Sequence, residues 1–177
     1  MELEEIQDVV ESGGYLDHQT LDIALDKYIQ EKSKEDLLTF VRKVAPTLVT
    51  DFHMGKHIEL LCDRLQKVAD GEIKRLMVFL PPRSSKSLIT SKIFPAWYIG
   101  REPNHEIMSV SHSDQLASDF GRSVRDIVNT EDFQRVFKGV ALRSDVKAAG
   151  KWKTNHNGSY YAAGVRSQIA GRGAHLA

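Results

Sequence analysis

The chain has almost no cysteine and no long apolar run, and both absences limit what it can be. Its 177 residues include one cysteine, Cys62, so no disulfide can form within the chain, which is typical of a reducing compartment. No apolar stretch approaches the roughly 20 residues of a membrane-spanning helix. The first residues, MELEEIQDVVES, are acidic and lack the basic start and apolar centre of a secretion signal. The sequence therefore predicts a cytoplasmic protein.

Charge is balanced over the whole chain but not along it. Residues 1–70 carry 15 acidic and 8 basic side chains, whereas residues 71–177 carry 9 acidic and 16 basic ones. If the protein binds a polyanion, the second part is expected to do so. The alternative is that each part is simply solvated by its own charges. Hydrophobic residues make up 41% of the chain, which is enough for the core of one domain.

The first part predicts helices. A short helix is expected over residues 2–12, ended by two glycines. Ser33 followed by Asp36 resembles a capping box, which predicts a helix that ends before Pro46. Apolar residues between 58 and 69 recur at helical spacing, and Asp70-Gly71 is expected to end that helix. We predict a helical N-terminal segment over residues 1–50.

From residue 74 onward the pattern changes to alternating strands and helices. RLMVFL (75–80) and EIMSVSH (106–112) are short apolar runs that predict strands of a buried parallel sheet. A helix that Pro95 bends or ends follows the first run, and a helix capped by Ser113 follows the second. Residues 150–165 predict a hairpin that turns near Asn157-Gly158. This alternation indicates an α/β fold.

The stretch LPPRSSKSLITSK, residues 80–92, lacks the glycines of a phosphate-binding loop but has its context. A phosphate loop has the pattern G-x-x-x-x-G-K-[ST], and here Leu80 and Ser85 stand at the glycine positions while Lys86 and Ser87 match the end. It lies between a predicted strand and a predicted helix, where backbone N–H groups and the helix N-terminus favour phosphate. Taken alone, the stretch is either a phosphate cradle or a basic, serine-rich surface turn.

The longer sequence resembles the large terminase subunit of tailed bacteriophages, the ATP-driven motor that packages DNA into the procapsid. The resemblance lies in GEIKRLMVFLPPRSSKSLITSKIFPAWYIGREPNHEIMSVSHSDQLASDFGRSVRDIV, in NTEDFQRVF and in KWKTNHNGSYYAAGVRSQIAGRGAHLA. It covers roughly residues 50–177. It implies a RecA-like P-loop ATPase core with an incomplete parallel sheet over residues 51–177, in the cytoplasm of a bacterial host. Double-stranded DNA, the small terminase subunit, the portal protein and a ring of identical subunits are the implied partners.

The resemblance also assigns site residues for ATP and Mg²⁺. The family's phosphate loop often begins P-P-R, so the missing first glycine is a family habit, and Ser85 is the departure. The implied nucleotide-binding residues are Pro82, Arg83, Ser84, Ser85, Lys86 and Ser87. Lys86 and Arg83 would act in catalysis, and Ser87 would hold Mg²⁺ through its hydroxyl. Phe52 and His53 are candidate adenine contacts, or else His53 and His57 form a surface pair at a helix end. A zinc site from His53, His57 and Cys62 does not fit any common spacing.

Three arginines are candidates for contacts with DNA or with a neighbouring subunit. Arg122 and Arg125 share one helix face, which is otherwise a solvated face. Arg172 lies in a G-R-G loop that resembles the family's loop before the Walker B strand, and it has either a sensing or a purely conformational role. Trp152, Tyr160 and Tyr161 are expected to pack in the core rather than stack on bases.

The implied acidic pair of the ATPase is missing from the sequence. In the family an apolar strand ending in two acidic residues follows the G-R-G loop, and here no aspartate or glutamate follows Asp145. We therefore expect the N-terminal ATPase fragment of a longer protein, inactive alone and without the nuclease domain. The alternatives are a nucleotide-binding or assembly module without turnover, and a remnant of a helicase-like P-loop NTPase.

Overall fold

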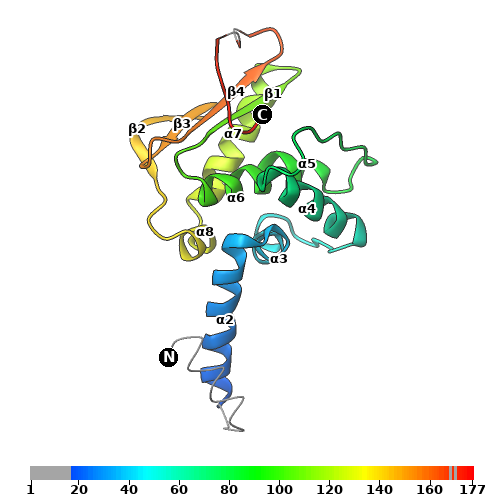
Figure 1. The fold of residues 1–177 in the computed structure, drawn as a ribbon, viewed down its shortest axis with the longest axis vertical. Coiled ribbons are helices and arrows are strands. Elements are labelled where there is room, and N and C mark those ends of the chain that lie inside the picture. The colour runs from blue at the N-terminus through cyan, green and yellow to red at the C-terminus, as the bar shows by residue number, and fades with distance from the viewer. Residues whose placement is uncertain (1–16, 168, 170) are drawn as a thin grey trace.

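The computed structural model describes residues 17–177 except residues 168 and 170, and it describes no side chains for 145–147. The helix predicted over residues 2–12 lies outside the described residues. The elements are α2 (His18–Glu35), α3 (Leu37–Leu48), α4 (Lys56–Ala69), α5 (Lys86–Leu88), the π-helical turn η1 (Ile89–Ile93), α6 (Phe94–Arg101), β1 (Glu106–Ser111), α7 (Asp114–Val128), α8 (Glu131–Val136), β2 (Leu142–Ala148), β3 (Lys151–Thr154) and β4 (Ser159–Gly164) (Figure 1). Helices and a sheet therefore make up a mixed α/β fold, as predicted. Among the described residues, no helix is long and apolar enough to cross a membrane.

Two helices make up the N-terminal part, and their boundary differs from the prediction. Asp36, not Ser33, caps α3, because its carboxylate accepts the backbone N–H of Thr39 at 2.7 Å. Ser33 lies within α2, where its hydroxyl donates to the carbonyl of Ile29. The prediction that the helix ends before Pro46 is wrong, because α3 continues to Leu48. Burial of five residues of α3 outweighs the one backbone hydrogen bond that proline removes near its end.

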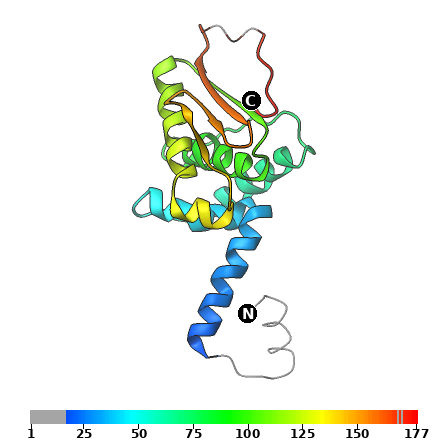
Figure 2. The same ribbon diagram turned by 90° about the vertical axis from the view of Figure 1, so that its left-hand side faces the viewer.

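Helix α4 forms where the apolar spacing predicts it. Its buried residues are Ile58, Leu61, Cys62 and Leu65. Gly71 follows at φ 78°, the left-handed conformation that ends helices at glycine, so the predicted stop is confirmed. Figures 1 and 2 show α2 projecting away from the rest of the molecule, whereas α3 and α4 lie against it. Side chains of α3 share one core with α6, α7 and the sheet. The boundary at residue 50 stays a prediction.

Residues 75–80 do not form the predicted strand. They have no partner in the sheet, although their side chains alternate as in a strand. Leu76, Val78 and Leu80 pack against the core, while Met77 is 81% exposed and Phe79 is 84% exposed. The apolar run thus predicts the burial pattern of one face correctly. Pairing requires a neighbouring strand, and none lies beside it among the described residues.

The helix after the loop is continuous from Lys86 to Arg101, but it changes its internal register. It begins as the short α5, widens to the π-helical turn η1 and continues as α6. Pro95 does not end the helix: it directly follows the π-helical turn η1, and the helix continues to Arg101. Seven consecutive residues of α6, Phe94 to Gly100, are buried. This helix therefore forms the centre of the core, and it fixes the loop that precedes it.

The sheet has four strands in the order β1-β4-β3-β2. Strands β1 and β4 are parallel, and the β3–β4 and β2–β3 pairs are antiparallel. The hairpin predicted over 150–165 is confirmed as β3 and β4, with Asn157 at φ 69° in its turn. The expected parallel sheet is therefore a mixed sheet with one parallel pair. Strand β2 lies in a stretch whose sequence predicts no element.

Helix α7 packs closely on this sheet and begins where predicted. The Ser113 hydroxyl accepts the N–H of Leu116 at 3.3 Å, which caps the helix. A side chain at Gly121 would place its Cβ 2.6 Å from the carbonyl oxygen of Ala149, so only glycine permits this approach. The Trp152 indole donates to the Gly121 carbonyl at 3.1 Å. Helix and hairpin are thereby fixed to each other.

Candidate phosphate-binding site

The loop before α5 has an unusual backbone for its sequence. Arg83 and Ser85 adopt positive φ, 60° and 59°, although neither is glycine. Ser84 donates its hydroxyl to the Pro81 carbonyl at 2.7 Å, which closes the turn. The Ser85 carbonyl then accepts the N–H of Ile89 at 3.0 Å, so the helix begins directly after the turn. Lys86 is the first helical residue.

Ser85 occupies the position at which the phosphate-loop pattern has its second glycine. The left-handed conformation costs an ordinary residue about 1 kcal/mol, and glycine adopts it freely. The structure therefore retains the glycine-type backbone with a serine in its place. Such strain is found where a fixed backbone geometry serves a function. The left-handed backbone of the second glycine position is thus present without its glycine.

A cavity of about 590 Å³ lies between this loop and the segment before α4. This volume is in the range of small-molecule sites. From the loop side it is lined by Leu80, Pro81, Pro82, Arg83, Ser84 and Ser85, and from the other side by Val49, Asp51, Phe52, His53, His57 and Ile58. The structure thus brings the predicted adenine contacts Phe52 and His53 to the predicted phosphate loop, some 30 residues away in sequence.

The charged side chains that line this cavity are Arg83 and Asp51, whereas Lys86 and Ser87 follow the loop and do not line it. Among the described residues, no hydrogen bond or ion pair is recorded for the side chains of Arg83 and Lys86. Arg83 is exposed and Lys86 is half-buried at the start of the helix. Two cations beside the start of a helix supply positive charge for an anion. The arrangement is suited to a phosphate group.

Two oxygen-bearing side chains near the loop are candidates for a metal ion. The Ser87 hydroxyl is exposed one residue after Lys86, and Asp51 supplies a carboxylate on the opposite wall of the cavity. Hydroxyl and carboxylate oxygens are the kind of ligand that Mg²⁺ takes, with phosphate oxygens and water completing its shell. No group of three or more potential metal-binding His, Cys, Asp or Glu side chains occurs within the described part of the chain. A role of Ser87 in holding Mg²⁺ therefore stays a prediction.

Sequence reasoning did not identify Asp51 as a site residue. Its signal was weak, because one aspartate in a short loop is usually a turn residue. The structure places it at φ 62°, in the turn between α3 and α4 and on the cavity wall. His57 also lines the cavity, whereas the sequence left it as one of a surface pair. Both positions depend on where the turn folds back, which local sequence does not determine.

The three candidate arginines lie apart from this cavity. Arg122 is exposed on α7, 3.6 Å from Asp119, and Arg125 contacts Asp126 at 3.2 Å on the same helix. Arg172 lies over the Tyr161 ring, 4.1 Å from its centre, and lines a separate cavity with Glu106 and Ser159. None of the three lines the cavity beside the loop. Their roles toward DNA or a neighbouring subunit stay predictions.

Two of the three hairpin aromatics are core residues, as expected. Trp152 and Tyr160 are fully buried and stack with their ring centres 5.0 Å apart and their planes within 3°. Tyr161 is half-buried beneath Arg172. The buried pair is therefore inaccessible to nucleic acid.

Comparison of the chain with protein-family models, with curated proteins and with solved structures finds no match. The class of the protein therefore rests on its own residues and geometry.

Proposed function

We propose that the chain binds a nucleoside triphosphate, with its phosphates on the loop 81–87 and its base toward Phe52 and His53. The observation that carries the proposal is the cavity between these two segments, bounded by a loop whose Ser85 holds a glycine-type backbone. The strained turn and Arg83 lie on one side of it, and Lys86 begins the helix that follows the turn. An aromatic ring and an imidazole lie on the other side.

Each residue has a distinct role in this proposal. Lys86 offers a point charge to the outer phosphates, and the planar guanidinium of Arg83 offers two parallel N–H groups to phosphate oxygens. Both would offset the charge that develops when water attacks the terminal phosphorus. Ser87 would contribute its hydroxyl to Mg²⁺, which supplies further charge neutralisation when bound. Phe52 offers a ring face for the base, and His53 a hydrogen-bonding edge.

More specifically, we propose that this is the ATPase part of a large terminase subunit, the motor that drives double-stranded DNA into a procapsid. The ordered sequence blocks from residue 71 to residue 177 support it, as does the α/β fold in which the loop precedes a buried helix. A RecA-like core, a ring of subunits, the small terminase subunit and the portal belong to the same proposal. The group that positions the attacking water is not assigned to any residue described above.

Binding of Mg·ATP tests the first step. Calorimetry with the full chain should show binding, and Lys86→Ala should weaken it by about tenfold or more, or about 1.4 kcal/mol. Lys138→Ala removes an exposed lysine outside the cavity and serves as the matched control. Absence of binding to the folded chain, or equal affinity of the Lys86 and Lys138 variants, would contradict the proposal. Hydrolysis is the poorer first assay, because the water-positioning group is unassigned.

An assembly module without turnover is the second candidate function. Helix α2 projects from the molecule and exposes Leu21, Ile23, Leu25 and Tyr28, which is an unusual number of apolar side chains for a solvated helix. A partner such as the small terminase subunit would cover them. The full chain should then retain that subunit in a pull-down, and Ile23→Lys should abolish retention while leaving Mg·ATP binding intact. Retention that is unaffected by Ile23→Lys would contradict this role for α2.

A further inference from the structure

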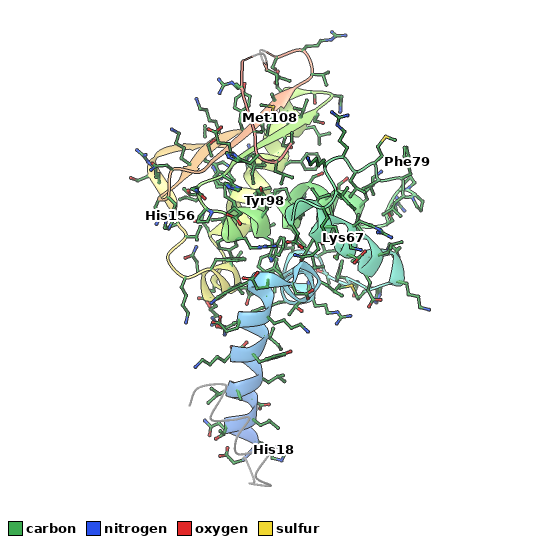
Figure 3. The ribbon with its side chains drawn as sticks, in the orientation of Figure 1. His18, Lys67, Phe79, Tyr98, Met108 and His156 are labelled. Atoms are coloured by element: carbon green, nitrogen blue, oxygen red, sulfur yellow. The ribbon has the colours of Figure 1, made fainter. Side chains whose placement is uncertain are left out.

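The projecting end of α2 carries an apolar stripe that is only half covered. The stripe consists of Leu21, Leu25 and Tyr28, which are 47%, 53% and 49% exposed. Their spacing of four and then three residues places them on one face of the helix. Figure 3 shows His18 at the tip of α2, far from the other labelled side chains. An apolar stripe in this position gains free energy when another segment covers it.

The two ends of α2 are fixed by different contacts. Toward its C-terminal end, the Trp97 indole of α6 donates to the Ser33 carbonyl at 2.8 Å. At its start, the Asp17 carboxylate accepts the Thr20 N–H at 2.9 Å and caps the helix. The chain enters α2 at this cap, beside the stripe, so the residues before Asp17 are within reach of it.

The sequence before α2, which lies outside the described residues, has a matching apolar pattern. Leu3, Ile6 and Val10 follow one another at three and then four residues, within the predicted helix 2–12. Two glycines come next, and residues 13–16 remain as the loop before the cap of α2. Loops of this length commonly join two antiparallel helices.

The two patterns fit each other when the two helices run antiparallel. The spacing of three and then four residues in the first segment is the reverse of the spacing along α2, so one register matches all three layers. Alternation of three and four residues is typical of the seam between packed helices. The matched layers are Val10 with Leu21, Ile6 with Leu25, and Leu3 with Tyr28.

We propose that residues 2–12 form a helix that folds back antiparallel on α2 and covers the stripe in this register. The tether favours this occupant, because a loop of four residues gives the segment a high effective concentration beside α2. A second copy of the chain is the poorer occupant, since three side chains offer far less than the roughly 800 Å² that each partner buries in a stable interface. The N-terminus and α2 then form one helical arm.

The surface of this arm indicates which partners it suits. Ile23 lies on the side of α2 away from the stripe, so it stays exposed and available to the partner of the second candidate function. The outer face of the returning helix is acidic, which disfavours nucleic acid as a partner. Its carboxylates are Glu4, Glu5, Asp8 and Glu11.

A pair of cysteines tests the register in the full chain. Ile6→Cys with Leu25→Cys should form an intramolecular disulfide on mild oxidation, because facing residues of packed helices lie within disulfide reach. The matched control is Ile6→Cys with Ile23→Cys, which has the same tether but places its second thiol on the far side of α2. The first pair should close about tenfold faster or more. The native Cys62 is buried and does not compete.

Amide exchange measures the same packing without added cysteines. Ile6→Gln removes the central layer and should speed exchange of the amides of residues 21–25 by about threefold or more. Asp8→Gln, on the outer face, should not. Equal closure of the two cysteine pairs, or equal exchange in the two glutamine variants, would overturn the proposal. A disulfide between two chains would assign the stripe to a second copy and would also overturn it.

Discussion

His105 and His175 stack face to face, with ring centres 4.2 Å apart and planes within 7° of each other. The Tyr98 hydroxyl contacts Nδ1 of His105 at 3.0 Å, and Nδ1 of His175 accepts the Glu106 N–H at 3.0 Å. The stack therefore connects the last residues of the chain to β1 and, through Tyr98, to α6. It lies beside the bridge between Leu176 and Ile107.

Removing this stack should release the bridge. His175→Ala loses the ring contact and the acceptor for the Glu106 N–H, which together are worth about 1–2 kcal/mol. We expect the Met108 amide to exchange faster, since its acceptor is the Leu176 carbonyl. His156→Ala, at an exposed histidine in the hairpin turn, is the control. If the Met108 amide exchanged equally in both variants, the stack would not hold the bridge.

Replacing Ser85 by glycine should stabilise the fold. Glycine relieves the left-handed strain at φ 59°, although it also increases the entropy of the unfolded chain, so the unfolding free energy should rise by about 0.5–1 kcal/mol. Under the proposed function it should also tighten Mg·ATP binding, because the backbone can approach phosphate more closely.

The matched control should change the unfolding free energy in the opposite direction. Ser87→Gly places glycine in the first turn of the helix two residues later and should lower the unfolding free energy by about 0.3–0.5 kcal/mol. Urea unfolding of the two variants measures both effects. Destabilisation by Ser85→Gly would show that the turn does not adopt the left-handed backbone in solution.

Replacing Tyr160 by phenylalanine should alter stability in alkali. Burial raises the pKa of the Tyr160 hydroxyl to about 12, with a small opposing effect of Ser109. The hydroxyl has no hydrogen-bond partner of good geometry among the described residues. Because the folded pKa lies above the unfolded value of about 10, this group's contribution is complete below pH 10 and is lost as pH rises toward 12.

Unfolding of wild type and Tyr160→Phe across this pH range measures the contribution. The variant should match or exceed wild type at pH 7, since it removes a buried hydroxyl that lacks a partner. Between pH 10 and pH 12 it should lose less stability than wild type. Cys62, whose pKa is also raised to about 12 by burial, is common to both chains and cancels. If both chains lost the same unfolding free energy between pH 10 and pH 12, the buried position of the hydroxyl would be contradicted.

Asp114 should contribute to stability in acid. Hydrogen bonds from the Ser167 hydroxyl and from the Gly164 N–H, the latter at 2.7 Å, hold the pKa of this carboxyl below its usual range. The folded pKa is depressed, so the contribution is present above the unfolded value of about 3.9 and is lost as pH falls through the folded pKa. The Asp114→Asn chain should therefore lose less stability than wild type below pH 3.9, as measured by acid unfolding. Asp22→Asn, on the exposed part of α2, is the control, and an effect of equal size there would exclude a specific role of Asp114.

Elements with local signals were predictable from the sequence. Helix α7 has its serine cap and apolar spacing within 16 residues, and the hairpin has its turn at Asn157-Gly158. Helix α4 has both its apolar spacing and its terminal glycine. Local sequence signals gave the wrong secondary structure where tertiary packing determines the conformation. Pro46 remains in a helix because α3 is buried, and residues 75–80 stay unpaired because pairing depends on a distant segment.

The candidate site also contains residues that the sequence predicts and residues that only the structure identifies. Lys86, Ser87 and the serine at a glycine position are visible in the sequence, because a phosphate loop is a contiguous motif. Asp51 and His57 were not identified as site residues, because they reach the loop only through the turn between α3 and α4. Likewise the pairing of Leu176 with Ile107 of β1 appears only in the tertiary structure.

The sequence by itself therefore determined helices α4 and α7, the hairpin and the composition of the loop, since capping, helical spacing and turn conformation involve neighbours within a few residues. The tertiary structure alone decided which strands pair, that the sheet is mixed and which residues face the loop across the cavity. The physical reason is that strand pairing and cavity formation join segments separated by tens of residues. Such contacts depend on how much apolar surface each arrangement buries, and not on the local backbone preference of either segment.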